Sequence, residues 1–413
     1  MKGFQKLTSV EHALDVFTKA VPVKKLKSEK TALSYALGRV LAESVVAVEN
    51  LPRFDRSAVD GYAVRAEDTV GASQFKPKAI KVVEHGIVSE GQAKQVWTGN
   101  AIPKDANAVV MLENIKRVGE KIEVWVPLTP GENVSRKGED VAKGKKAIRA
   151  GVRLTPYHLA MVAALGKTEV TVFARPVVAV LATGNELAEI GGKLRPNHVF
   201  DTNRIMISAM CRELGAEPLD LGMVKDDADE IAGKLAKGLR EADVVITTGG
   251  TSVGLVDLVP DAVNKTGKPG VVVHGVAMRP GMPTALAVVN KKPVLVLSGN
   301  PVAAVVGFET FARPLICRLL GLKETELRPA VKARLSKRVV SALGRKTFVR
   351  VRVVKLDGDF VAEPVSAKGS GTLSTMTEAN GFVVVAGDRE GLEEGEVVSV
   401  NLFDAIIEAG PNV

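Results

Sequence analysis

The chain has very little cysteine: its 413 residues include only Cys211 and Cys317, and neither belongs to a CxxC motif or a Cys/His cluster. We therefore expect neither a disulfide framework nor a structural zinc site, and we expect both thiols to be buried. No apolar run approaches the roughly 20 residues of a membrane-spanning helix. The first residues also lack the apolar core and cleavage site of a secretion signal, which predicts a soluble, cytoplasmic protein.

Aromatic residues are scarce as well, at 4% of the chain, so few side chains could stack on nucleic-acid bases. The net charge of +9 arises from 56 basic and 47 acidic residues spread along the chain. Even the densest basic stretch, at 24–30, is interrupted by Glu29. The composition therefore favours small anionic ligands, and neither nucleic acid nor a membrane, as partners.

The first part of the sequence contains helical patterns on both sides of a β-rich stretch. Apolar spacing predicts helices at 9–21, behind a Ser9 cap, and at 31–42. A further helix is predicted at 155–166, with Thr155 as its cap and a proline in its first position. We therefore expect one discontinuous helical domain built from residues 1–44 and 142–174, around an inserted β-rich domain at 45–141.

From residue 176 the sequence alternates continuous apolar strands with amphipathic helices, the pattern of a parallel, doubly wound α/β sheet in three layers. It predicts a central α/β domain at 175–325, including a hairpin at 284–299. After about residue 326 short strands indicate a small antiparallel barrel or sandwich, and we assign residues 326–413 to a C-terminal β-barrel domain. The fold class is thus multidomain α/β plus β, and ligands of such α/β sheets bind at the carboxyl ends of the strands.

The segment "TTGGTSVGLVD", at 247–257, follows one of these strands. Its glycines can turn backbone N–H groups toward an anion, and its hydroxyls can add hydrogen bonds to phosphate oxygens. Asp257 would repel a bare phosphate, which suggests an intervening Mg²⁺. A structural turn with Asp257 as a helix cap explains the segment about equally well. It matches neither the Walker A nor the GxGxxG pattern. The binding candidates here are Thr248, Gly249, Gly250, Ser252 and Gly254.

A second strand-to-helix junction, "LSGNP" at 297–301, places Gly299 and Asn300 before a helix that begins with proline. The free N–H groups of that helix would suit another phosphate-like group, whereas the alternative is that Asn300 only caps its own helix. Between the two junctions, Arg279 in "AMRPGMP" offers a fixed cation for phosphate or is a solvated turn residue.

Several acidic residues lie on predicted loops. Glu186 follows a strand in "ATGNEL", and Asp226 precedes a helix in "VKDDADE". Asp60 belongs to "FDRSAVDGYAVR" and Asp140 to "SRKGED". Taken singly, each is explained by a turn, a helix cap or a polar loop, so the residues alone leave their chemistry open.

Together these segments resemble the MoeA-type molybdopterin molybdenumtransferases, a family related to the E domain of gephyrin. The resemblance covers essentially the whole chain. It is carried, in the family's order, by "FDRSAVDGYAVR", "WTGNAIPKDANAVVMLE", "SRKGEDV", "ATGNEL", "TTGGTSVGLVDLV", "MRPGMPTAL", "LSGNPVAAVVGFE" and "GSGTLSTMTEANG".

The resemblance implies an enzyme of molybdenum cofactor biosynthesis that cleaves adenylylated molybdopterin, releases AMP and inserts molybdate, or tungstate, into the dithiolene. It implies Mg²⁺ dependence, a homodimer with clefts between domains of different subunits, and the adenylyltransferase that supplies the substrate as a partner. By motif match, Asp257 would be the metal ligand. The other residues carried over are Asp60, Asp140 and Asp226 as catalytic residues, and Thr98, Glu186 and Ser370 as substrate-binding residues.

Two departures from the family pattern are visible. Met282 stands where many members have a second lysine, which removes one cationic contact, and Ser298 replaces the proline of "LPGNP". The alternative functions are a molybdopterin adenylyltransferase, whose α/β domain is similar, and a non-enzymatic scaffold of the gephyrin E-domain type. The additional domains argue against the first alternative, and the complete set of acidic residues argues against the second.

Overall fold

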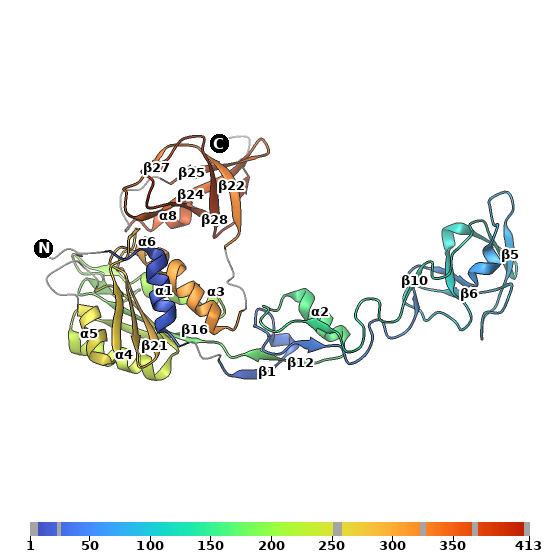
Figure 1. Cartoon of the computed structure of the whole chain (residues 1–413), viewed down its shortest axis with the longest axis horizontal. Coiled ribbons are helices and arrows are strands. Elements are labelled where there is room, and N and C mark those ends of the chain that lie inside the picture. Colours follow the sequence, from blue (N-terminus) through green and yellow to red (C-terminus); the bar gives the residue numbers. More distant parts are fainter. Residues whose placement is uncertain (1–6, 23–25, 251–257, 323–327, 366–370, 409–413) are drawn as a thin grey trace. The chain divides into compact units, whose positions relative to one another are not determined.

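The computed structural model describes residues 7–22, 26–250, 258–322, 328–365 and 371–408. They belong to two compact units (Figure 1). The larger unit comprises Met1–Glu29 and Phe173–Val413, and the smaller unit comprises Lys30–Val172. Among the residues that the structure describes, no helix has both the length and the apolar character needed to cross a membrane. Cys211 and Cys317 are buried, as predicted, and burial raises the pKa of the Cys211 thiol to about 12.

The larger unit is built on a six-stranded sheet with the order β16-β13-β17-β21-β20-β18. The first four strands of this order are parallel, and β20 and β18 continue the sheet in antiparallel pairs. Asn290 and Lys291 join β20 to β21 with positive φ at both positions, as a tight hairpin turn requires, so the predicted hairpin is confirmed. The strand bounds are β13 (Val177–Thr183), β16 (Glu217–Val224), β17 (Val244–Thr248), β18 (Pro269–His274), β20 (Ala285–Val289) and β21 (Lys292–Leu297).

Helices cover both faces of this sheet, which confirms the doubly wound architecture (Figure 1). On one face α4 and α5 bury Ile231, Leu235 and Val259 against the strands. Helix α6 continues through a π-helical turn, Phe308–Ala312, into α7. The helix bounds are α1 (Val10–Ala20), α3 (Asn203–Glu213), α4 (Ala228–Glu241), α5 (Leu258–Thr266), α6 (Pro301–Gly307) and α7 (Arg313–Leu319).

The C-terminal part of the larger unit is a closed five-stranded barrel, as predicted, in the order β24-β25-β22-β28-β26 with β26 pairing back to β24. The short strand β19 (Met278–Arg279) pairs with β24, so the "RPGMP" turn lies against the barrel wall. Other short elements are β23 (Val339–Val340), β27 (Gly391–Leu392), β29 (Ile407–Glu408) and α8 (Ser374–Glu378). The barrel bounds are β22 (Ala330–Leu335), β24 (Lys346–Leu356), β25 (Asp359–Pro364), β26 (Gly381–Val385) and β28 (Val397–Leu402).

The smaller unit has one core around α2 (Pro156–Ala164), which begins with the predicted Thr155 cap. Two further clusters lie on opposite faces of a six-stranded β-rich sheet in the order β7-β4-β6-β5-β9-β8. Its strands are β4 (Gly61–Val64), β5 (Lys78–Val82), β6 (Gln92–Val96), β7 (Ala108–Met111), β8 (Ile115–Val118) and β9 (Lys121–Val124). Three short pairs are β1 (Ser28–Ala32) with β12 (Glu169–Phe173), β2 (Val45–Val46) with β11 (Lys146–Ile148), and β3 (Arg56–Ser57) with β10 (Val134–Ser135).

The helix predicted at 31–42 is wrong. Only a 3₁₀ turn forms there, at Leu33–Tyr35, and Gly38 has a φ of +73°, outside the helical region. Several backbone N–H groups of this segment instead donate to distant carbonyls. Gly38 N–H donates to Leu154 O, and Leu41 N–H donates to Val152 O. Partners remote in sequence thus replace the local hydrogen bonds of a helix.

Helix α1 also differs from its expected place. It was assigned with residues 1–44 to the helical domain, but it contacts β18 and β20 of the α/β sheet. Its buried residues Val10, Ala13 and Phe17 form the amphipathic face that the sequence pattern predicts. The amphipathic pattern identifies a buried face without identifying what covers it. The other boundaries, after residues 44, 141, 174 and 325, stay predictions.

Helix α4 provides a matched test of packing on the sheet. A Cβ at Gly238 would lie 2.8 Å from Leu221 Cδ1 and 3.2 Å from Ala179 Cβ, whereas a Cβ at the exposed Gly233 would meet nothing within 4 Å. We expect Gly238→Ala to lower the free energy of unfolding by about 1–3 kcal/mol because it overpacks the core. Gly233→Ala should raise it by about 0.5–1 kcal/mol through helix propensity.

Urea denaturation of both variants, followed by circular dichroism, measures the difference. Equal stability of the two variants would contradict the close packing of α4 against the sheet.

Candidate ligand-binding site

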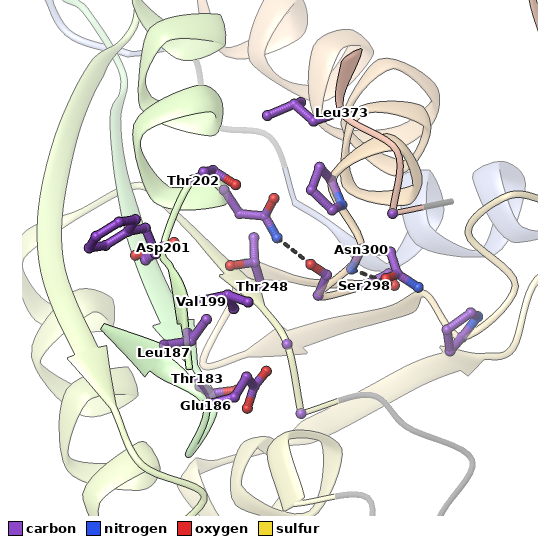
Figure 2. Close-up of a pocket in the computed structure, with 18 residues that line it drawn as sticks. Thr183, Glu186, Leu187, Val199, Asp201, Thr202, Thr248, Ser298, Asn300 and Leu373 are labelled. Carbon is purple, nitrogen blue, oxygen red and sulfur yellow. Dashed lines mark hydrogen bonds between the residues drawn. The ribbon is translucent and has the colours of Figure 1, made fainter. Parts of the chain in front are cut away.

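The first cavity of interest lies where three neighbouring parallel strands end. β13 ends at Thr183, β17 at Thr248 and β21 at Leu297. The turns after these strands enclose a cavity of about 760 Å³, which we call the edge cavity (Figure 2). In Figure 2 Leu373, which follows Gly371 in the chain, lies on the side of the cavity away from Thr183. The other lining residues are Glu186, Leu187, Val199, Phe200, Asp201, Thr202, Asn203, Gly249, Gly250, Pro283, Ser298, Gly299, Asn300 and Pro301.

Both glycines after β17 lie too close to neighbouring atoms to carry a side chain, Gly249 to a backbone oxygen and Gly250 to a side-chain methyl group. A Cβ at Gly249 would lie 2.1 Å from Thr183 O, and one at Gly250 would lie 2.4 Å from Val259 Cγ2. Both glycines have positive φ, at +93° and +64°. Gly249 N–H donates to Leu297 O at 3.1 Å. The sequence suggests this N–H group as a donor to an anion, but in the structure it binds the end of β21. The pair therefore ties three strand ends together and forms a wall of the cavity.

The second junction contributes polar groups to the same cavity. Asn300 stands at the cap position of α6, but its side chain makes no capping hydrogen bond among the described residues. The alternative that Asn300 only caps its helix is thus not supported. Its backbone N–H donates to Ser298 Oγ at 3.3 Å, and Asn203 Nδ2 donates to Gly299 O at 2.7 Å (Figure 2). The start of α3 is thereby bound to the turn after β21.

Arg204 binds three acidic residues and thereby holds the loop along one side of the edge cavity. Arg204 Nε donates to Asp201 Oδ2 at 2.9 Å, and Arg204 also binds Asp220 at 2.9 Å and Glu189 at 2.8 Å. Asp201 is buried. The loop carries the short strands β14 (Leu187–Ala188) and β15 (Val199–Phe200), whose apolar side chains line the cavity. The cavity therefore combines a polar junction with an apolar wall.

Arg279 lies in a second cavity, of about 610 Å³, which we call the arginine cavity. Its lining includes Arg345 and Arg350, and it shares Pro283, Ser298 and Asn300 with the edge cavity. Burial lowers the pKa of Arg350, and its Nε is buried with no hydrogen-bond partner in the described part of the chain. Met282, the departure from the family pattern, also lines this cavity. The arrangement offers three cationic side chains to an anion beside the edge cavity.

Two acidic residues predicted from loops lie near the carboxyl edge of the sheet. Glu186 lines the edge cavity. Asp226 N–H donates to Asn185 Oδ1 at 3.2 Å, and Asp226 Oδ1 is buried without a partner among the residues described. The cap of α4 is the next residue, Asp227, which accepts from two backbone N–H groups. Asp226 is therefore not a helix cap, and its carboxylate is available for another role.

Asp60 and Thr98 meet in the smaller unit. Thr98 N–H and Thr98 Oγ1 both donate to Asp60 Oδ1 at 2.7 Å. The backbone N–H bond, and then the hydroxyl bond, lower the pKa of Asp60, so this exposed group is a carboxylate well below neutral pH. Asp140 lies in the same unit, where its N–H donates to Leu51 O at 3.1 Å. The motif match had placed all three in one functional set, and the structure brings Asp60 and Thr98 into direct contact.

Four predicted residues, Ser252, Gly254, Asp257 and Ser370, lie outside the described residues. Within the described ranges, no group of three or more His, Cys, Asp or Glu side chains is arranged to hold a metal ion. Sequence reasoning missed Thr183, Asn203, Arg345 and Arg350. The alternating "RVRV" that contains Arg350 was a usable signal, because it predicts a strand with basic residues on one face.

A doubly wound sheet with a polar cavity at its carboxyl edge places the chain among the α/β proteins whose fold offers a ligand site at the ends of its parallel strands. Comparisons with known families agree. The MoeA N-terminal region (domains I and II) matches residues 8–166, a probable molybdopterin-binding domain matches 179–318, and the MoeA C-terminal region (domain IV) matches 332–403.

Relatives match over nearly the full length. The molybdopterin molybdenumtransferase of Bacillus subtilis is 38% identical over 389 residues, covering 91% of this chain and 90% of the relative. That of Staphylococcus aureus strain MSSA476 is 34% identical over 382 residues, covering 91% of each chain. The crystal structure of a MoeA molybdopterin biosynthesis protein from Pyrococcus horikoshii has a TM-score of 0.79 at 35% identity, covering 97% of this chain and 100% of that chain. The chain belongs to the MoeA family.

Proposed function

We propose that this chain is a molybdopterin molybdenumtransferase, an enzyme of molybdenum cofactor biosynthesis. The observation that carries the proposal is the edge cavity, because the strand ends that form it lie within the segment matched as a probable molybdopterin-binding domain. The names of the relatives support the same activity.

The proposed substrate is adenylylated molybdopterin, whose pyrophosphate linkage is cleaved with release of AMP. Two strand-to-helix junctions and Thr248 offer polar groups to a diphosphate, while Leu187, Val199 and Phe200 offer an apolar surface to a ring system. A cavity of about 760 Å³ is within the usual range for a ligand of this size. The shape and polarity of the cavity thus support a ligand with phosphate and ring moieties.

Mg²⁺ fits the donor chemistry of this edge. Mg²⁺ takes one or two carboxylates and completes its shell with water and phosphate oxygens, so it does not need a cluster of three acids. Glu186 lines the cavity, and Asp226 Oδ1 is buried without a partner in the ranges described. We propose Asp257 as the principal ligand. The ion, when bound, would neutralise charge on the diphosphate. Glu186 and Asp226 would position the part of the substrate that lies at this edge of the sheet.

The proposed second substrate is molybdate, with tungstate as the other candidate because both are tetrahedral dianions. The arginine cavity supports this, since Arg279, Arg345 and Arg350 offer positive charge next to the edge cavity. Asp60 and Asp140 of the opposite subunit of a homodimer would position the oxyanion or accept protons at this site. The lowered pKa of Asp60 keeps the carboxylate ionised, which does not suit a proton donor and also makes it a weaker base, so positioning is the better supported of the two roles.

The substrate also indicates which reaction precedes this one. The adenylylated pterin must come from an adenylyltransferase, which is therefore the proposed upstream partner. We propose that the chain works in the cytoplasm as a homodimer.

Alanine at Asp60 or at Asp257 should lower formation of the molybdenum cofactor by at least about 100-fold, because each removes a charged group acting on a reacting centre. The assay supplies adenylylated molybdopterin, Mg²⁺ and molybdate, and measures both AMP and the metal content of the pterin. Unchanged activity in either variant would show that the carboxylate it lacks does not act on a reacting centre, whereas a wild-type chain without activity would favour a scaffold. Activity only with ATP and free molybdopterin would instead identify an adenylyltransferase.

Arg350→Gln should raise the molybdate concentration for half-maximal rate about tenfold, since it removes a charged hydrogen-bond donor from the arginine cavity. Arg389→Gln is the matched control, because Arg389 lies in the same domain but pairs with Glu396 away from the cavity. An equal effect of the two substitutions would show that the arginine cavity does not hold the oxyanion.

A further inference from the structure

Two buried polar atoms of the edge cavity have no hydrogen-bond partner among the described residues: Thr183 Oγ1 and Asn203 Oδ1. Thr183 is 2% exposed and Asn203 is 7% exposed. A buried donor or acceptor without a partner destabilises the folded protein, so such atoms are uncommon and call for an explanation. Neither residue belongs to the set that the motifs indicate.

The hydroxyl of Thr183 lies against the glycine pair. A Cβ built on Gly249 would be 3.1 Å from Thr183 Oγ1, and a Cβ built on Gly250 would be 2.9 Å from it. The hydroxyl is thus located where β13 meets the turn after β17. Because a hydroxyl can rotate its hydrogen, it can donate to a phosphate oxygen placed over this turn.

The side-chain amide of Asn203 has a defined orientation. Its Nδ2 donates to Gly299 O at 2.7 Å, and a carbonyl oxygen can only accept, so the nitrogen must be the atom on that side. Oδ1 is therefore the atom that lacks a partner, and it can only accept a hydrogen bond. The missing partner must then carry an N–H or O–H group.

We propose that Thr183 and Asn203 are additional substrate-binding residues that together set the orientation of the ligand. Thr183 donates its hydroxyl hydrogen to a phosphate oxygen, and Asn203 Oδ1 accepts from an N–H or O–H group on the same ligand. A bare diphosphate satisfies only Thr183, whereas a nucleotide or pterin satisfies both. The identity of the ligand rests on the proposed function, but the pairing of one donor with one acceptor does not.

Thr247 supplies a matched control. It lies on β17, is 0% exposed, and its Oγ1 also lacks a partner in the part of the chain described. It does not line the edge cavity, whereas its neighbour Thr248 does, because successive side chains of a strand point to opposite faces. Thr183→Val and Thr247→Val therefore each remove one buried threonine hydroxyl, from two adjacent strands, but only Thr183 lines the edge cavity.

The experiment measures binding of AMP and of inorganic pyrophosphate by calorimetry, together with KM for adenylylated molybdopterin, on the full-length chain. We expect Thr183→Val to weaken both AMP and pyrophosphate about tenfold, and Thr247→Val to change neither. Asn203→Ala should leave pyrophosphate unchanged. If it weakens AMP, the donor group belongs to the nucleotide; if it raises only KM for the full substrate, the donor belongs to the pterin.

Two results would overturn the proposal. One is equal binding and KM in Thr183→Val, Thr247→Val and wild type, and the other is an Asn203→Ala protein that matches wild type for all three ligands. Thermal unfolding checks that each variant is folded, and the comparison of the two threonines stands even if Asn203→Ala does not fold. Wild-type protein that binds pyrophosphate but neither binds AMP nor turns over the substrate would refute the proposed function alone.

Discussion

The site in the larger unit depends on the close approach of the Gly249 backbone to the end of β13. A side chain at this position would overlap Thr183 O, and the Gly249 N–H is bonded to Leu297 O. This one glycine therefore joins the ends of three parallel strands. Thr248, Glu186 and the turn around Asn300 surround the resulting junction and face one cavity. The missing side chain lets these strand ends approach closely, so that one ligand can meet all three turns.

The sequence predicted the elements whose hydrogen bonds are local or whose apolar pattern is long. The α/β alternation, the hairpin joining β20 to β21 and the closed barrel were all found. The prediction failed at 31–42, where Gly38 and Leu41 bond to residues more than a hundred positions later. It also could not decide the partner of α1, because an amphipathic helix packs on any complementary apolar face.

The candidate site could be predicted only at positions where the residue type has few structural explanations, as with several glycines directly after a strand. Glycines after a strand indicated the junction, but the close contact that requires Gly249 depends on three strands meeting. Asp226 and Asp227 are indistinguishable in sequence, and only the structure shows that Asp227 is the cap. Thr183 stands within "ATGNEL", yet its residue type does not mark it as a binding residue, and the same holds for Asn203, because a threonine at a strand end and an asparagine at a helix start are ordinary.

The two cavities suggest a division of tasks within the larger unit, with a diphosphate at the glycine junction and an oxyanion beside the arginines. The most direct test of this account is a crystal structure of the full-length chain soaked with AMP. The account predicts that the phosphate lies in the edge cavity, within hydrogen-bond distance of the turns at 248–250 and 298–300. Nucleotide density at another place, with the edge cavity occupied only by water, would contradict it.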